Sequence, residues 1–338
     1  MSDRAERAGA APRPAPPIAE REGAWDAGAA SVASAVVPVS PELLDELQRN
    51  RALLGHQVSA DSASVDNAAF PRLRREAGRL LRTCLDAGLG FVILRGLDPG
   101  LFSAAEMENV FWRLCNILGE PLVQKGPAIR FGRVADLKLP AEARPRYHET
   151  GVGGSMHTDS PIMEQVADLV GLLCVRSAAK GGESKFVSVA RVHNILLRHA
   201  EDLLAELYGT FYFDRRIPPG AVSRENPALL RAPIFTYDPK LGARGLRLRW
   251  QPEYVWQAPE LPGVPPLGER QKLALHLLEG VLEDKAGAIT IRLPMQAGDM
   301  QLLNNHAVAH GRTAFADSPE AAESSGREMR RVWLRRRP

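Results

Sequence analysis

The sequence predicts a mostly β-stranded protein with α-helices around its core. The chain has 338 residues, of which 45% are hydrophobic and 25% charged, a composition typical of a globular protein. Helical patterns dominate the first ordered third, whereas much of the remainder consists of short segments divided by glycine and proline, as in β-strands. A chain of this size can form one β-barrel domain decorated with helices.

The N-terminal residues 1–39 are rich in alanine, proline, glycine and serine. Such a segment buries too little side-chain surface to offset the entropy lost on ordering, so we expect a flexible extension. Order is expected to begin at Ser40, which can cap a helix whose first residue is Pro41. The predicted organisation is therefore an extension over 1–39 and one domain over 40–338.

Further helices are indicated by caps and by the spacing of apolar residues. Ser103 and Glu106 form a capping-box pattern at the start of one helix, which Gly119 closes, and Gly88 closes another. An apolar, strand-like run, FVILRGL, occupies 91–97. The helical stretches are expected at 70–88, 103–119, 189–208 and 268–284.

Several classes of protein are disfavoured by composition. The formal net charge is only +3, which gives no reason to expect a nucleic-acid partner. The three cysteines have no C-x-x-C spacing, and no apolar run approaches the roughly 20 residues that a membrane span needs. No secretory signal is apparent at the N-terminus. We therefore expect a cytoplasmic protein that uses neither membranes nor nucleic acids and that can form homo-oligomers.

The stretch GSMHTDSP contains a histidine and an aspartate two residues apart. If MHTD is a strand, His157 and Asp159 project to the same face and can chelate one metal ion. A lone H-x-D pair is weak evidence, because it also occurs on surface loops.

A second polar cluster, GDMQLLNNHAVAHGRTAF, lies far downstream. It places His306 and His310 in an apolar setting, and on a strand both would point the same way, so geometry does not choose between them. Two histidines and one carboxylate make the facial triad of non-haem Fe(II) oxygenases, which leaves positions open on the metal. Zinc hydrolases use similar ligands but keep one water-bearing position.

A 2-oxo acid co-substrate would need a partner for its distal carboxylate. A planar guanidinium pairs with a carboxylate in a fork geometry, and the segment REMRRVWL offers several arginines. If this segment is a strand, Arg327 and Arg331 share one face and Arg330 lies on the other. Ser184, in GGESKF, is a candidate hydroxyl donor to the same carboxylate.

The motifs GFVILRGL, MHTDSP, AAKGGESKFVS, AGDMQLLNNHAVAHGRTAF and REMRRVWL, in this order, resemble the taurine dioxygenase (TauD/TfdA) family of Fe(II)/2-oxoglutarate-dependent oxygenases. The resemblance covers roughly residues 40–338 and implies a double-stranded β-helix, or jelly roll, with flanking helices. It also implies Fe(II), 2-oxoglutarate and O2 as cofactor and co-substrates.

The family pattern can be transferred to individual residues. It implies that His157, Asp159 and His310 are the metal ligands and that Ser184 contacts 2-oxoglutarate. It favours Arg331 as the main carboxylate anchor with Arg327 as its companion, although Arg327, Arg330 and Arg331 remain alternatives.

The resemblance implies an enzyme that oxidises an unactivated C–H bond of a small molecule, such as an amino-acid-like compound or a natural-product intermediate, with release of succinate and CO2. Halogenases of this kind replace the carboxylate ligand with Ala or Gly, so Asp159 favours hydroxylation, desaturation or ring formation. The alternatives are a zinc- or manganese-dependent hydrolase or isomerase on the same barrel, and a non-catalytic barrel that senses a metabolite.

Overall fold

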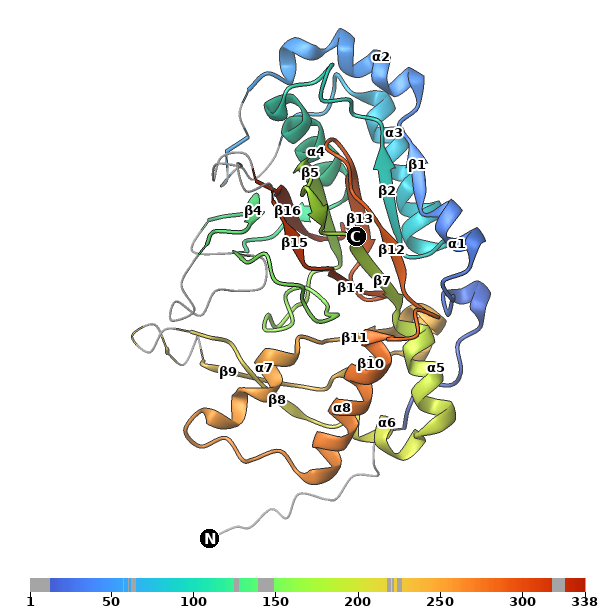
Figure 1. The fold of residues 1–338 in the computed structure, drawn as a ribbon, viewed down its shortest axis with the longest axis vertical. Coiled ribbons are helices and arrows are strands. Elements are labelled where there is room, and N and C mark those ends of the chain that lie inside the picture. Colours follow the sequence, from blue (N-terminus) through green and yellow to red (C-terminus); the bar gives the residue numbers. More distant parts are fainter. Residues whose placement is uncertain are drawn as a thin grey trace.

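The chain folds as a mixed structure of helices and sheets, in which two β-sheets face each other and helices cover their outer sides (Figure 1). The computed structural model describes residues 13–56, 58–59, 61, 65–124, 128–138, 149–217, 220, 222–223, 227–317 and 326–337. Within these residues, no helix is both long and apolar enough to cross a lipid bilayer.

The larger sheet has seven strands. In spatial order, six of them are β1 (Val36–Pro38), β2 (Phe91–Arg95), β13 (Met300–Asn304), β5 (Leu169–Arg176), β16 (Glu328–Arg335) and β3 (Glu120–Pro121). The seventh, β4 (Gly132–Ala135), pairs with the start of β16. Only the pairing of β1 with β2 is parallel among those in this sheet.

The smaller sheet has three antiparallel strands and faces the inner side of the larger one. They are β12 (Ile291–Leu293), β7 (Ser184–Ser188) and β14 (Val308–Arg312). Phe91 of the larger sheet stacks on Phe186 of the smaller one, with ring centroids 3.9 Å apart. An apolar cluster contributed by both sheets therefore fills much of the space between them.

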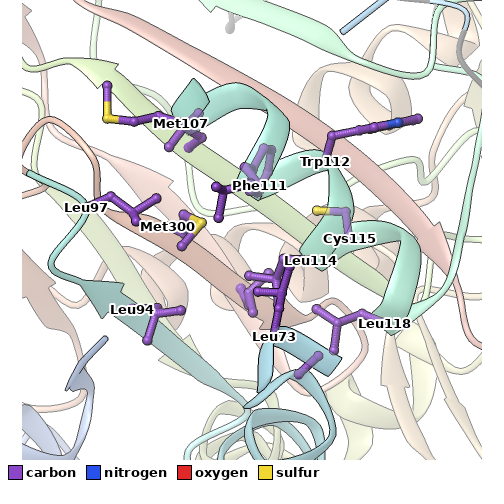
Figure 2. Packing of buried hydrophobic residues seen from close by; sticks show 14 of the residues in the cluster. Leu73, Leu94, Leu97, Met107, Phe111, Trp112, Leu114, Cys115, Leu118 and Met300 are labelled. Carbon is purple, nitrogen blue, oxygen red and sulfur yellow. The ribbon is translucent and has the colours of Figure 1, made fainter. Parts of the chain in front are cut away.

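Helices α2 (Pro41–Arg49), α3 (Pro71–Leu80) and α4 (Ala104–Leu118) belong to the apolar cluster on the outer side of the larger sheet. Figure 2 shows side chains of α4, including Phe111 and Leu114, among residues of the sheet such as Met300 and Leu94. Ser103 starts α4 with the expected capping box: its hydroxyl accepts from the backbone N–H of Glu106, whose carboxylate accepts from the N–H of Ser103.

A third group of elements packs on the outer face of the smaller sheet, through residues such as Val187 and Ala309. Its helices are α5 (Val189–His199), α6 (Glu201–Leu207), α7 (Pro252–Trp256) and α8 (Glu269–Glu283). This group also contains two two-stranded sheets, β8 (Phe211–Asp214) with β9 (Leu229–Ala232) and β10 (Phe235–Tyr237) with β11 (Leu246–Leu248). A separate two-stranded sheet pairs β6 (Lys180–Gly181) with β15 (Phe315–Ala316).

The helices expected from caps are confirmed, with differences at two of them. The helix expected over 189–208 is split into α5 and α6, because Ala200 adopts an extended φ of −160°. The helix expected over 70–88 continues from α3 into a π-helical turn, Leu81–Asp86. Ser40 caps α2 by accepting from the backbone N–H of Leu43, as expected.

The N-terminal extension differs from the expectation over its described part, 13–39. The strand β1 and the helix α1 (Ala29–Ser34) belong to this part, which also packs on the rest of the chain. Trp25 is buried, and its indole N–H donates to the carbonyl of Leu89. Composition underestimated this segment because a few apolar residues anchor it. Residues 1–12 lie outside the described residues.

Replacing Trp25 tests this packing. Trp25→Ala is expected to lower the free energy of unfolding by about 3 to 5 kcal/mol, because it removes a large buried side chain that also contacts Phe91. The exposed Arg21→Ala should change it by less than about 0.5 kcal/mol. Urea denaturation followed by circular dichroism measures both. Equal, small effects would show that the segment is a loose extension.

Candidate functional site

Three buried side chains with metal-binding atoms converge between the two sheets. Ligand atoms of His157, Asp159 and His310 all lie within 4.8 Å of one another, and each residue is 5–6% exposed. His310 is in the middle of β14, whereas His157 and Asp159 belong to the segment that precedes β5. The group that the sequence pointed to is therefore brought together from two distant parts of the chain.

The segment MHTD does not form the regular strand from which a common face of His157 and Asp159 was inferred. His157 forms an isolated antiparallel bridge with His310, in which each backbone N–H donates to the other's carbonyl at 2.8 Å. The next residue, Thr158, bonds instead to the backbone of Trp250. This segment is therefore held by individual hydrogen bonds to different parts of the chain, and not by the continuous series of backbone hydrogen bonds that a strand would have.

Asn305 supports Asp159, the second candidate ligand of this segment. It is fully buried in the turn between β13 and β14, and its side-chain oxygen accepts from the backbone N–H of Asp159 at 2.8 Å. Its amide nitrogen donates to the carbonyls of Asp159 and Ala167 at 3.0 and 2.9 Å. The sequence left open whether Asn304 and Asn305 orient ligands or cap the turn. Asn305 holds the backbone of Asp159, whereas Asn304 bonds within its own turn and to Leu85.

The imidazole of His157 is oriented towards the cluster by its backbone. Its Nδ1 lies 3.0 Å from the carbonyl of Ser155, so Nδ1 carries the proton and Nε2 is the unprotonated ring nitrogen. Burial, reinforced by the neighbouring His310, lowers the pKa of His157 to about 4. The ring is therefore neutral at physiological pH, which is the form that binds a metal.

Asp159 is ionised although it is buried. Burial by itself would raise the pKa of Asp159, but the charge of Arg331 and the hydrogen bond with His310 hold it well below its usual range. Arg331 Nη1 lies 3.2 Å from Asp159 Oδ1, and His310 Nε2 lies 3.5 Å from Asp159 Oδ2. The ionised carboxylate of Asp159 and the neutral imidazole of His157 thus lie beside the imidazole of His310, in a group that could hold a cation.

Arg331 is fixed beside the cluster by contacts on two sides. Its Nε donates to the side-chain oxygen of Gln124 at 2.8 Å, and Gln124 in turn donates to the carbonyl of Arg331. The guanidinium also lies over the ring of Trp333, 4.7 Å from the centroid. The prediction that REMRRVWL forms a strand is confirmed from Glu328 onward by β16, and Arg331 points inward as expected, whereas Arg327 lies just before the strand.

Arg327 and Ser184 lie in a different part of the interior from Arg331. In the smaller sheet Phe186 pairs with His310 and Ser184 pairs with Arg312, so Ser184 is two residues along from the level of His310. The charge of Arg327 acts on the buried thiol of Cys174, and a β carbon added at Gly182 would lie 3.1 Å from Arg327 Nε. Arg327 is therefore next to the segment that carries Ser184.

Other polar residues of the motifs have separate partners. Arg330 points to the outer face of the larger sheet, where its Nε lies 2.8 Å from Glu108 of α4. His306 bonds to Asp168 at 2.9 Å and does not join the cluster. Arg312 donates to the backbone carbonyls of Thr150, Gly151 and Thr313. It therefore holds the segment around Gly151 against the end of β14.

The sequence reasoning missed one polar residue of the interior, Gln301. It lies in β13 and is 1% exposed, and its side-chain oxygen accepts from the hydroxyl of Ser184 at 2.7 Å. The signal was present as a single amide in the apolar run MQLL, since a buried polar side chain in such a run requires a hydrogen-bonding partner.

A buried pair of imidazoles with one carboxylate, held between two sheets, has the donor set of a non-haem Fe(II) oxygenase site. The protonation states favour metal binding, and Nδ1 of His310 is a buried nitrogen without a partner in the described part of the chain. The family model of the taurine catabolism dioxygenase TauD, TfdA family matches residues 49–333. The chain belongs to this family.

The chain is also similar in sequence to individual proteins. FR-33289 synthase of Streptomyces rubellomurinus (strain ATCC 31215) is 29% identical over 282 residues, which cover 80% of this chain and 76% of that protein. A taurine hydroxylase-like protein, SAT17, of Stachybotrys chartarum (strain CBS 109288 / IBT 7711) is 25% identical over 242 residues, which cover 70% of this chain and 59% of that protein.

Solved structures share the fold at low sequence identity. An asparagine oxygenase in complex with Fe(II), 2S,3S-3-hydroxyasparagine and succinate has a TM-score of 0.63 and 18% identity, with 89% of this chain and 93% of that chain covered. The non-heme iron oxygenase OrfP in complex with Fe and alpha-ketoglutaric acid has a TM-score of 0.60 and 15% identity, with coverage of 88% and 93%.

The contacts of Asn305 predict an effect on metal binding. Asn305→Ala is expected to weaken divalent-metal affinity roughly 10- to 100-fold, the usual cost of removing a residue that orients a metal ligand. Its neighbour Asn304→Ala, which does not touch Asp159, is the matched control. Anaerobic titration with Co(II), followed by visible absorption, measures both affinities. The same loss in both variants would mean that the turn, and not the Asp159 contact, matters.

Proposed function

We propose that this protein is an Fe(II)- and 2-oxoglutarate-dependent oxygenase that hydroxylates, or otherwise oxidises, an unactivated C–H bond of a small molecule. The observation that carries the proposal is the buried cluster of His157, Asp159 and His310, whose donor types and protonation states suit Fe(II). Membership of a dioxygenase family supports the same reaction class. We further propose that the two facing sheets are the halves of a double-stranded β-helix within one catalytic domain.

The roles of the residues follow from their positions. His157, Asp159 and His310 would hold the iron and leave positions free for 2-oxoglutarate and O2. When bound, iron and 2-oxoglutarate supply the activation of O2, and succinate and CO2 are released. Arg331 keeps Asp159 ionised, while Gln124 fixes Arg331. The contribution of the chain is to position the reactants and to limit access of water to the buried cluster.

The distal carboxylate of 2-oxoglutarate is better placed at Arg327 than at Arg331. Arg331 already contacts a metal ligand, whereas the distal carboxylate must lie further from the metal than the end of the molecule that chelates it. Arg327 lies beside the segment of Ser184, which is two strand residues, roughly 6.6 Å, from the level of His310. We therefore propose Arg327 as the charged anchor, in place of the Arg331 that the sequence pattern favoured.

The relatives suggest the kind of substrate. Their names and ligands include 3-hydroxyasparagine in an asparagine oxygenase, (3S)-hydroxy-L-Arg in OrfP, and the product name FR-33289. These support an amino-acid-like molecule or a natural-product intermediate as the substrate of this chain. The carboxylate of Asp159 supports oxidation without halogenation.

The iron and co-substrate can be tested together. Anaerobic addition of Fe(II) and 2-oxoglutarate should produce the visible charge-transfer band of a chelated 2-oxo acid, and His157→Ala combined with His310→Ala should abolish it. His306→Ala is the control that should keep the band, because His306 bonds to Asp168 away from the cluster. Absence of a band in the wild type, with activity restored by zinc alone, would indicate a hydrolase or isomerase. A band without succinate formation in air would indicate a sensor.

The choice of anchor gives a second test. Arg327→Ala should raise the dissociation constant of 2-oxoglutarate roughly 10- to 100-fold, because it removes charge-assisted hydrogen bonds. Arg330→Ala, on the outer face of β16, should change it little. Titration of the charge-transfer band measures the dissociation constant of 2-oxoglutarate for these two variants and for Arg331→Ala. A larger effect of Arg331→Ala than of Arg327→Ala would return the anchor to Arg331.

A further inference from the structure

Gln301 is an amide in the apolar interior that the proposed roles above do not use. Its neighbours in β13, namely Met300, Leu302 and Leu303, are buried and apolar. Placing an amide among them costs free energy unless its polar atoms are satisfied. Its oxygen accepts from the hydroxyl of Ser184, which is the one side-chain hydrogen bond of Gln301 among the described residues. The amide therefore has two N–H donors that no described residue accepts.

The strand pairing places this amide on the inner face. Gln301 pairs with Leu172 of β5, which in turn pairs with Arg331 of β16. Paired residues of antiparallel strands point to the same face, so Gln301 and Arg331 share the face that looks towards the metal cluster. Ser184 meets Gln301 from the smaller sheet, at the level two residues along from His310. The pair thus spans the interior where the distal carboxylate is proposed to lie.

The hydrogen bond between the two side chains has a chemical consequence. A serine hydroxyl has a single proton, and here Ser184 directs it to Gln301 at 2.7 Å. That proton is not available to a bound carboxylate unless Gln301 loses its partner. Because its oxygen is held by Ser184, the amide is oriented with its N–H groups directed away from Ser184.

We propose that the amide of Gln301, and not the hydroxyl of Ser184, donates the neutral hydrogen bond to the distal carboxylate of 2-oxoglutarate, and that Ser184 orients the amide. This rests on the proposed function and on Arg327 supplying the charge. In this arrangement Gln301 contributes to the selection of 2-oxo acids that have a second carboxylate. Ser184 becomes a positioning residue.

The test compares two 2-oxo acids of equal length. 2-Oxoglutarate has the distal carboxylate and 2-oxopentanoate lacks it, and anaerobic titration of the Fe(II) protein, followed by the charge-transfer band, gives both dissociation constants. Gln301→Met, which keeps the length and unbranched shape of the side chain, should raise the constant for 2-oxoglutarate about tenfold. It should leave the constant for 2-oxopentanoate unchanged. Ser184→Ala should have a smaller effect than Gln301→Met, because the amide donors remain.

Controls separate this proposal from a loss of structure and from failure of the proposed function. Asn116→Leu replaces another buried amide, on α4 outside the site, and should leave both constants unchanged. Thermal denaturation verifies that each variant is folded. If Gln301→Met weakens both 2-oxo acids equally or neither, or if Ser184→Ala has the larger effect, the proposal is wrong. If the wild type binds neither 2-oxo acid, the proposed function itself fails.

Discussion

The site depends on one short backbone interaction, the pair of hydrogen bonds between His157 and His310. These two bonds join an irregular segment to the middle of β14, and they bring two imidazoles to a centroid distance of 4.5 Å. The segment has no strand ladder to hold it, so its other residues rely on separate contacts with Trp250 and Asn305. Loss of the bridge would leave a carboxylate and two imidazoles without a common centre.

The protonation states of His157 and Asp159 depend on burial and on neighbouring charges. Because the three candidate ligands lie so close together, the charge of each shifts the pKa of the others. Burial keeps His157 neutral, and the nearby guanidinium of Arg331 keeps Asp159 ionised. The same arginine depends on Gln124 for its position. Gln124, which is not among the candidate metal ligands, thus influences the charge of Asp159, which is one of them.

Much of the fold and of the site could be predicted from the sequence where the signal is local. Ser40 and the pair Ser103 and Glu106 fixed helix starts, because capping is a short-range interaction. The alternation of β16 correctly separated Arg331 from Arg330. The packing of Trp25 and the contacts of Asn305 and Gln301 could not be predicted, because each depends on a partner far away in the chain.

The pairing of β5 with β16 has a consequence for how the protein acquires its cofactor. These strands lie side by side in the larger sheet, yet Leu169 pairs with Leu334, so nearly half of the chain separates the partners. Contacts between such distant residues form late in folding, since closing a long loop costs entropy before the contact is made. The bridge between His157 and His310 spans a comparable distance. A partly folded chain therefore lacks His310 beside His157 and Asp159, and tight binding of a metal by all three residues requires the folded pairing.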